Sequence, residues 1–265
     1  MRVIIAQNAA EVASKAASFI ASVVDDRRAA GGAAVLGVAT GSSPLGTYGA
    51  LADRVRSGEL DLAGVSAFAL DEYLGLDREH PESYHAVIHR TVTEPLGLDP
   101  ALVHVPDGLA DDLVAACASY ERAMREAGGV DLQLLGIGAN GHIGFNEPGS
   151  SLASRTRIKT LAPQTRDDNA RFFDSHEQVP MHCVTQGIGT ILDAERLLLV
   201  AQGEAKAEAV AAMVEGPVSS MCPASALQLH PHAIAIVDRD AASRLELSEY
   251  YIYVERHRPK AMTFA

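Results

Sequence analysis

The sequence predicts an α/β fold in which a mainly parallel sheet is covered by helices on both faces. Short apolar runs, typical of buried strands, alternate with longer helix-like stretches along all 265 residues. Parallel strands are buried on both faces, so their sequences are continuous apolar runs rather than an alternation of apolar and polar residues. No repeat, low-complexity tract or long linker divides the chain, which is long enough to bury one large core. We therefore expect a single domain, residues 1–265.

The order of apolar and amphipathic segments gives the expected elements. The predicted strands are Arg2–Ala6, Ala33–Ala39, Val65–Leu70, Leu102–Val105, Val130–Leu135, Arg196–Ala201 and Ala233–Val237. The predicted helices are Ala9–Ala30, Pro44–Val55, Pro81–Thr93, Ala110–Ala127, Arg166–Phe173, Gly187–Leu192 and Gly203–Val214. The tail Tyr250–Tyr253 fits either a helix or a strand, and the polar stretch Ser150–Arg166 is expected to be irregular. The composition of Asn146–Val184 suggests a mobile lid.

Charge and cysteine content exclude several classes of protein. The net charge of −12 at pH 7 argues against nucleic acid, which is bound largely through clustered Lys and Arg. A small anionic substrate remains compatible, because a few cations can reverse the field within one cleft. Three cysteines without C-x-x-C spacing indicate neither a disulfide framework nor a zinc knuckle. With no signal-peptide pattern and no apolar run near the roughly 20 residues of a membrane helix, we expect a soluble cytoplasmic protein.

The segment Leu134–Gly149, LLGIGANGHIGFNEPG, is the strongest candidate for an active site. It follows a predicted buried strand, and open α/β sheets bind ligands at the carboxyl ends of their strands. Its five glycines permit positive φ and close backbone approach to a ligand. A flexible turn is the alternative, but glycines interleaved with Asn140, His142, Asn146 and Glu147 favour a functional loop on a rigid scaffold.

Two other loops follow predicted strands. The first, Thr40–Pro44, reads TGSSP and precedes a helix, whose free N–H groups and positive dipole end can bind an anion. An ordinary serine cap is the alternative, and a P-loop is excluded because the G-K-[ST] ending is missing. The second loop begins with Asp71 and Glu72, two carboxylates expected to point in different directions. A partly desolvated carboxylate there could act as a general base, although solvated turn residues are the ordinary alternative.

The cationic and imidazole side chains also have both a binding and a purely structural interpretation. The basic residues that follow the glycine-rich loop are Arg155, Arg157, Lys159, Arg166 and Arg171. Lys206 is predicted in the first turn of a helix, where a cation opposes the dipole unless an anion is held nearby. Solvated surface charge is the alternative for each of them. His85 and His89 have a metal-binding spacing, but without a third ligand no metal site is expected.

Taken together, these segments resemble the glucosamine-6-phosphate deaminase family. The resemblance rests on TGSSP, ALDEYLGL, HPESYH, GIGANGHIGFNEPG, SSLASRTRIKTL, RFFD and QLHPHA, in order over nearly the whole chain. It implies a modified doubly wound, Rossmann-like α/β fold and a homo-oligomer, a hexamer in bacterial relatives. It also implies conversion of glucosamine 6-phosphate and water to fructose 6-phosphate and ammonia in amino-sugar catabolism. No metal or organic cofactor is expected.

The resemblance assigns roles to residues already singled out. Asp71 matches the base that moves a proton from C2 to C1 of the open sugar. His142 matches the acid/base of ring opening, and Glu147 matches the carboxylate that tunes it. Asn140 replaces an aspartate found in some members, so it can orient the imidazole by a hydrogen bond but cannot supply charge. The residues that match a phosphate site are Thr40, Gly41, Ser42, Ser43, Arg171 and Lys206.

Regulation and substrate identity stay open at this stage. Four residues resemble a second anion site that binds N-acetylglucosamine 6-phosphate in allosteric members: Ser150, Ser151, Arg157 and Lys159. Having these residues does not establish coupling between two sites. The alternatives to the deaminase are a 6-phosphogluconolactonase, a deaminase for the galactosamine epimer, and a non-catalytic sugar-phosphate sensor. The carboxylates Glu147 and Asp71 favour the deaminase over the lactonase, whose corresponding loop typically continues toward Leu-Phe-Pro.

Overall fold

The large sheet confirms the predicted α/β fold. The computed structural model describes residues 1–259, and within them seven strands form one sheet in the order β1-β10-β9-β6-β2-β3-β5. All six neighbouring pairs are parallel. The strands are β1 (Arg2–Ala6), β2 (Val35–Val38), β3 (Ser66–Ala69), β5 (Val103–His104), β6 (Leu132–Leu135), β9 (Leu197–Ala201) and β10 (Ala233–Asp238). Each of the seven predicted apolar runs therefore contains one strand.

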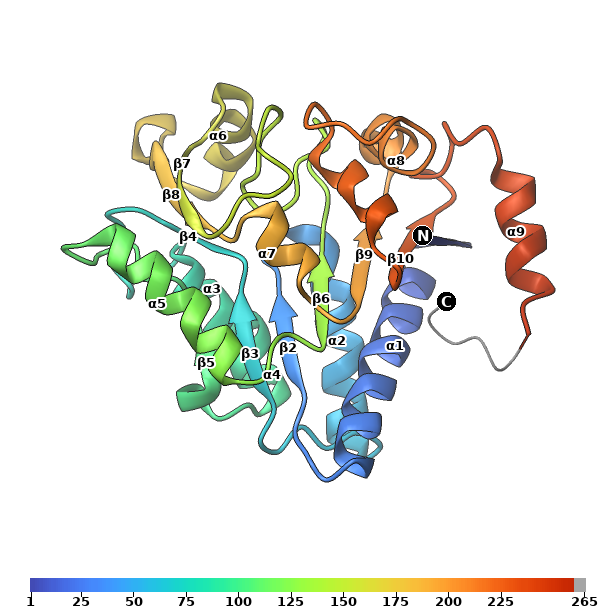
Figure 1. The fold of residues 1–265 in the computed structure, drawn as a ribbon, viewed down its shortest axis with the longest axis horizontal. Helices are drawn as coiled ribbons and strands as arrows, with labels where there is room; N and C mark the ends of the chain where they lie inside the picture. Colours follow the sequence, from blue (N-terminus) through green and yellow to red (C-terminus); the bar gives the residue numbers. More distant parts are fainter. Residues whose placement is uncertain (260–265) are drawn as a thin grey trace.

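Helices cover both faces of this sheet (Figure 1). The larger hydrophobic core lies under α1 (Ala9–Ala29), α2 (Ser42–Ser57) and α4 (Glu94–Leu96). The opposite face packs against α5 (Leu113–Glu126), α7 (Ile188–Leu192) and α8 (Ala207–Val214). Successive side chains of one strand enter opposite cores, as Leu198 and Leu199 do, because strand side chains alternate between faces. The central strands are consequently apolar on both faces, apart from the buried Gln133 of β6.

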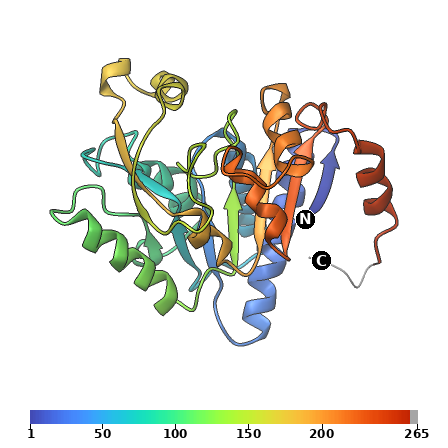
Figure 2. The same cartoon turned by 45° about the horizontal axis from the view of Figure 1, so that its top comes forward.

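A small antiparallel sheet corrects the prediction that Ser150–Arg166 is irregular, because one of its strands lies within that stretch. It has the order β4-β8-β7 and is formed by β4 (Asp71–Tyr73), β8 (His182–Thr185) and β7 (Arg157–Thr160). Between β7 and β8 lies the short helix α6 (Pro163–Asn169), which begins before the predicted Arg166. Figure 2 shows that these yellow segments project beyond the carboxyl edge of the large sheet. The small sheet thus stands beside the edge where ligands are expected.

Several helix boundaries also differ from prediction. Helix α2 begins at Ser42, so Pro44 is its third residue rather than its first, a position where a missing N–H still costs no helical bond. The predicted Pro81–Thr93 helix is α3 (Tyr84–Ile88) followed by a π-helical turn, His89–Thr93. Short 3₁₀ segments occur at Pro100–Leu102, Ala170–Phe172, His176–Gln178, Glu204–Lys206 and Pro223–Leu229.

The carboxyl-terminal helix resolves the ambiguity left by the tyrosine-rich tail. Residues 250–253 lie in α9 (Ser248–Arg256), which packs beside the edge strand β1 and is joined to it by the ion pair Arg2–Glu255. None of the helices within residues 1–259 combines the length and apolar character needed to span a membrane.

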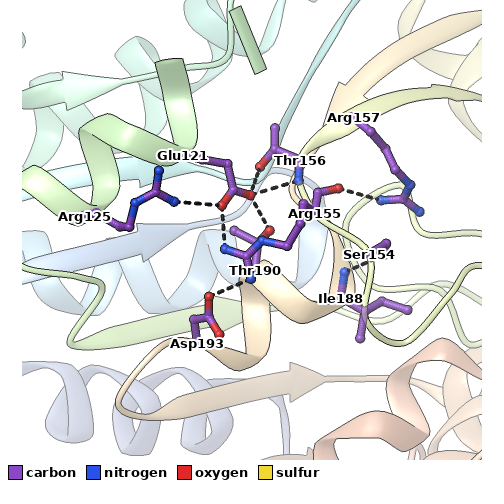
Figure 3. A network of polar contacts seen from close by, with 9 residues as sticks. All are labelled: Glu121, Arg125, Ser154, Arg155, Thr156, Arg157, Ile188, Thr190 and Asp193. Carbon is purple, nitrogen blue, oxygen red and sulfur yellow. Dashed lines mark hydrogen bonds and ion pairs between the residues drawn. The ribbon is translucent and has the colours of Figure 1, made fainter. Parts of the chain in front are cut away.

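One buried carboxylate, Glu121 of α5, fastens the small sheet to the large one (Figure 3). Its Oε1 accepts the backbone N–H and the hydroxyl of Thr156, at 2.9 and 2.7 Å, and also the hydroxyl of Thr190 in α7. Its Oε2 forms an ion pair with Arg155, and the same guanidinium also donates to Asp193 Oδ2 at 2.6 Å. Burial alone would raise the pKa of Glu121, but these hydrogen bonds hold it at about 2. The cluster therefore joins α5, α7 and the start of β7.

Replacing this carboxylate should loosen the junction. We expect Glu121→Gln to lower the free energy of unfolding by about 2–4 kcal/mol. The amide oxygen can still accept from the two threonines, but Arg155 loses its charged partner and faces an NH2 group instead. The ionised Glu121 stabilises the fold above its unfolded pKa, and that contribution is lost as the pH falls toward 2. The deficit of the variant should therefore shrink between about pH 4.5 and pH 2.

Urea unfolding across this pH range measures the effect. Glu126→Gln, an exposed carboxylate on the same helix, is the matched control and should stay within about 0.5 kcal/mol of the parent protein. Equal stability of the two variants at pH 7 would contradict the role given to Glu121.

Candidate active site

A cavity of about 380 Å³ opens at the carboxyl edge of the large sheet. It lies beside β2 and β6, where the strand order switches direction, the usual place for ligands in open α/β sheets. Eight predicted residues line it: Thr40, Gly41, Ser42, Ser43, Asp71, His142, Arg171 and Lys206. Groups far apart in the chain therefore face a single space.

The TGSSP segment presents a free helix terminus to this cavity. Gly41 precedes the 16-residue helix α2 with φ of 93°, and no side chain caps the first N–H groups. The preceding turn is fixed by Tyr48, whose hydroxyl donates to Ala39 O and accepts from Ala39 N–H, both at 2.9 Å. Uncapped N–H groups at the positive end of a helix dipole form a site for an anion.

Two cations face the same end of the cavity. Arg171 lies in the 3₁₀ turn after α6, and Lys206 ends the turn Glu204–Lys206 rather than lying inside a helix, as was predicted. Burial lowers the pKa of Lys206, and the charge of Arg171 lowers it further. The charge of Asp168 opposes this shift, but no ion pair joins Arg171 or Lys206 to an acid within residues 1–259. Two such cations favour binding of an anion that can neutralise both.

Asp71 occupies the other part of the cavity and is 5% exposed. Burial, together with the charge of Glu72, raises its pKa to about 8, although the backbone N–H of Phe145 opposes the shift. The Glu72 carboxylate points elsewhere, as predicted, and accepts the backbone N–H groups of Tyr73, Tyr84 and His85. A carboxyl with a pKa near neutrality is suited to proton transfer.

Glycine at position 144 allows the loop to approach Asp71. Its φ is +53°, and a Cβ there would lie 3.0 Å from Thr185 Oγ1 and 3.3 Å from Asp71 Oδ2. Glycine at position 138 serves the imidazole in the same way, since a Cβ would collide with the ring of His142. The glycines of this loop thus make room for the two titratable groups.

Glu147 lies behind His142, outside the cavity lining. Its Oε2 is 3.6 Å from His142 Nδ1, too far for a hydrogen bond, and that nitrogen has no hydrogen-bond partner among the described residues. Burial alone would raise the pKa of Glu147, but His142 and hydrogen bonds from Thr165 and Asn140 lower it to about 2. Glu147 is therefore an ionised neighbour of the imidazole.

Asn140 makes no hydrogen bond to the imidazole ring in the described part of the chain, which corrects the role predicted for it. Its Nδ2 donates to Glu147 Oε2 at 2.8 Å, and its Oδ1 accepts the backbone N–H of His142 at 3.1 Å. The amide side chain therefore fixes the carboxylate and the loop backbone rather than the ring. An amide suits this position because it has both a donor for Glu147 and an acceptor for the His142 backbone.

Comparison with known proteins decides the family. The family model of glucosamine-6-phosphate isomerases and 6-phosphogluconolactonases matches residues 7–236. The chain belongs to this family. The glucosamine-6-phosphate deaminase of Cutibacterium acnes is 58% identical over 258 residues, 97% of each chain, and that of Streptomyces coelicolor is 63% identical over 227 residues, 85% of this chain and 87% of its own.

Solved structures of the family share the fold. The structure of a monomeric glucosamine-6-phosphate deaminase is 43% identical, with a TM-score of 0.88, over 92% of this chain and all of its own. The 6-phosphogluconolactonase of Trypanosoma cruzi is 18% identical with a TM-score of 0.75, over 92% of this chain and 97% of its own, and shows the fold alone. The resemblance predicted from the sequence motifs is thus confirmed. The chain is more similar to this deaminase than to this lactonase, both in sequence identity and in TM-score.

Sequence reasoning missed residues that position this family's site. Thr165 donates its hydroxyl to Glu147 Oε1 at 2.5 Å and lines the cavity. Gln186 donates its backbone N–H to Leu70 O at 2.7 Å and its Nε2 to Ala69 O at 3.0 Å, beside the start of β4. Its carbonyl accepts from Asn146 Nδ2 at 2.8 Å. No local pattern marks these residues, because their partners are distant in the sequence.

The four residues that resemble an effector site lie elsewhere. Ser150 is buried, and its hydroxyl has no hydrogen-bond partner among residues 1–259. Ser151 is exposed, while Arg157 and Lys159 lie on β7. A second cavity, between α5 and β7, includes Arg157 but not the other three. The described residues also contain no cluster of three or more side chains that could hold a metal ion, so His85 and His89 belong to no such cluster there.

The buried Asp71 should reduce the stability of the folded protein. Its carboxyl has a folded pKa of about 8 and an unfolded pKa near 4, so the free energy of unfolding falls as the pH rises from 4 to 8, and the full penalty remains above pH 8. Asp71→Asn carries no titrating group, and we expect it to raise the free energy of unfolding by about 1–2 kcal/mol at pH 8. The gain should vanish near pH 4.

Thermal and urea unfolding at several pH values test this difference. Asp26→Asn, on the exposed side of α1, provides the control for loss of one carboxylate and should leave the stability almost unchanged. A destabilised Asp71→Asn protein at pH 8 would mean that the ionised carboxylate is stabilised in the fold.

Proposed function

We propose that this protein is a glucosamine-6-phosphate deaminase, converting glucosamine 6-phosphate and water to fructose 6-phosphate and ammonia. The observation that carries the proposal is the common cavity shared by Asp71, His142 and an anion site built from α2, Arg171 and Lys206. Acid and base groups at one end and a phosphate site at the other match a phosphorylated sugar undergoing proton transfer. The names of relatives at 58% and 63% identity support the same reaction.

The phosphate group is held by the amino terminus of α2 and by the two cations. The N–H groups after Gly41 donate to phosphate oxygens, and the hydroxyls of Ser42 and Ser43 are near enough to add further donors. Arg171 and Lys206 supply charge-assisted bonds. This anchoring fixes the sugar carbons relative to Asp71 and His142, which converts proton transfer into a step between pre-positioned groups.

Ring opening is the work of His142. The closed pyranose hides its C1 electrophile, so a proton must leave the C1 hydroxyl and another must reach the ring oxygen. The imidazole carries out this exchange, and its free Nδ1 faces the ionised Glu147 at 3.6 Å. The carboxylate stabilises the imidazolium that forms, because an opposite charge nearby favours the protonated ring.

Isomerisation and deamination are the work of Asp71. In its ionised form it takes the C2 proton of the open aldehyde, and the C2–H electron pair becomes the C1–C2 double bond. A proton passes from the ammonium group of the substrate to O1, which gives an enolamine. Return of a proton to C1 gives a C2 iminium, water adds at C2, and ammonia leaves to produce the ketose. Burial makes Asp71 a stronger base than an exposed aspartate, and the positively charged amino group of the substrate favours its ionised form.

Three finer predictions accompany this function. A hexameric assembly and activation by N-acetylglucosamine 6-phosphate at Ser150, Ser151, Arg157 and Lys159 stay predictions, as does a lid around residues 146–184. One relative of known structure is described as monomeric. Discrimination between the glucosamine and galactosamine epimers depends on contacts with one sugar carbon.

A substrate panel tests the proposal directly. We expect ammonia release from glucosamine 6-phosphate, little or none from galactosamine 6-phosphate, and no hydrolysis of 6-phosphogluconolactone. Asp71→Asn should keep its affinity for the sugar phosphate while turnover falls by about 10²–10⁴-fold, the usual contribution of a positioned base. Calorimetric binding and an ammonia assay measure the two quantities separately. Lactone hydrolysis without ammonia release would refute the proposal.

Adding a methyl group beneath the imidazole should damage turnover without weakening substrate binding. In Gly138→Ala the new Cβ displaces the His142 ring, so we expect kcat to fall by about 10–100-fold with KM little changed. Gly49→Ala in α2, whose Cβ would meet no atom within 4 Å, is the matched control. It should gain about 0.4–1 kcal/mol of stability and keep full activity. Equal turnover of both variants would contradict the position given to His142.

A further inference from the structure

The phosphate end of the cavity contains a carboxylate as well as two cations. Asp168 lies on α6, one helical turn before Arg171, and both residues line the cavity together with Lys206. An acidic side chain beside the groups that bind phosphate has no evident use in attraction, since it carries the same sign of charge as the ligand.

The position of Asp168 is defined by its neighbours. Gln164, one turn earlier on α6, donates its Nε2 to Asp168 Oδ1 at 3.0 Å. No ion pair within 4 Å joins Asp168 to a cation in the described part of the chain, so the carboxylate acts on Lys206 through space. Its negative charge favours protonated Lys206, whereas burial and the charge of Arg171 oppose that form.

The neighbouring carboxylate differs in all these respects. Asp167 makes an ion pair with His176 at 3.0 Å and is absent from the cavity lining. The two aspartates thus share a helix and an exposed environment but only one of them faces the proposed phosphate site. They form a matched pair for experiment.

We propose that Asp168 sets the phosphate affinity of the cavity, acting as an internal counter-charge that the phosphate group must overcome. The inference rests on the proposed phosphate site. In the free protein Asp168 offsets the repulsion between Arg171 and Lys206. When a phosphate dianion takes over that neutralisation, the carboxylate becomes a like-charged neighbour and weakens binding.

This arrangement affects substrate and product alike. Both sugars of the proposed reaction carry the same phosphate, so an attenuated site releases the product faster at the expense of a higher KM. The alternative role, a hydrogen bond from a sugar hydroxyl to Asp168, predicts the opposite sign. Removing such an acceptor would weaken binding rather than strengthen it.

Calorimetric titration with inorganic phosphate is the decisive measurement, using Asp168→Asn and Asp167→Asn side by side. We expect Asp168→Asn to bind phosphate about three- to tenfold more tightly than the parent, with a similar fall in KM and no increase in kcat. Asp167→Asn should bind as the parent does. Raising the salt concentration to about 0.5 M should shrink the difference, because exposed charges are screened.

The phosphate titration does not depend on turnover, so the two proposals can fail separately. Tighter phosphate binding by Asp168→Asn in a protein that releases no ammonia would leave this inference standing and refute the proposed reaction. Unchanged or weaker phosphate binding, relative to Asp167→Asn, would overturn the role of Asp168 whatever the activity. Equal melting temperatures of the two variants establish that the comparison is between folded proteins.

Discussion

The carboxylate of Glu147 is the contact on which the geometry of the site depends. Its Oε2 faces His142 and accepts from Asn140, while its Oε1 accepts the Thr165 hydroxyl and, at 3.3 Å, the Ala162 backbone N–H. The last two donors belong to the start of α6, the segment that leads to Arg171. One ionised side chain thus fixes the imidazole loop relative to α6 and Arg171, so a buried polar contact sets the distance between His142 and the proposed phosphate site.

Two buried carboxyls of this region have pKa values shifted in opposite directions, and their surroundings explain why. Glu147 receives donors from Thr165 and Asn140 and lies beside an imidazole, so its pKa falls to about 2. Asp71 is as buried, but it has one backbone donor and a neighbouring negative charge from Glu72, so its pKa rises to about 8. The donors around the two acids therefore keep Glu147 ionised, whereas Asp71 can gain and lose a proton near neutral pH.

Sequence reasoning succeeded where information is local. Seven apolar runs marked seven parallel strands, and the glycine-rich loop marked the imidazole because its residues are contiguous. It failed for β7, which lies in the stretch predicted to be irregular, and it did not predict β8, which pairs with both β4 and β7 in contacts visible only in three dimensions. Contacts such as Thr165 to Glu147 or Glu121 to Thr156 join distant segments, so no motif could reveal them.

Stability is reduced at two points of this fold, and both belong to the site. Helix α2 begins without a side-chain cap even though two serines stand in its first turn, which leaves its N–H groups free for an anion. Asp71 is buried with only one backbone donor, too few to keep its pKa in the usual range of a carboxyl. Hydrogen-bonded neighbours hold each defect in place: Tyr48 of α2 bonds to Ala39 before the helix, and Gln186 bonds to Ala69 beside β4. Rigid support around an unsatisfied group is what pre-organised catalysis requires, because the missing partner is the substrate.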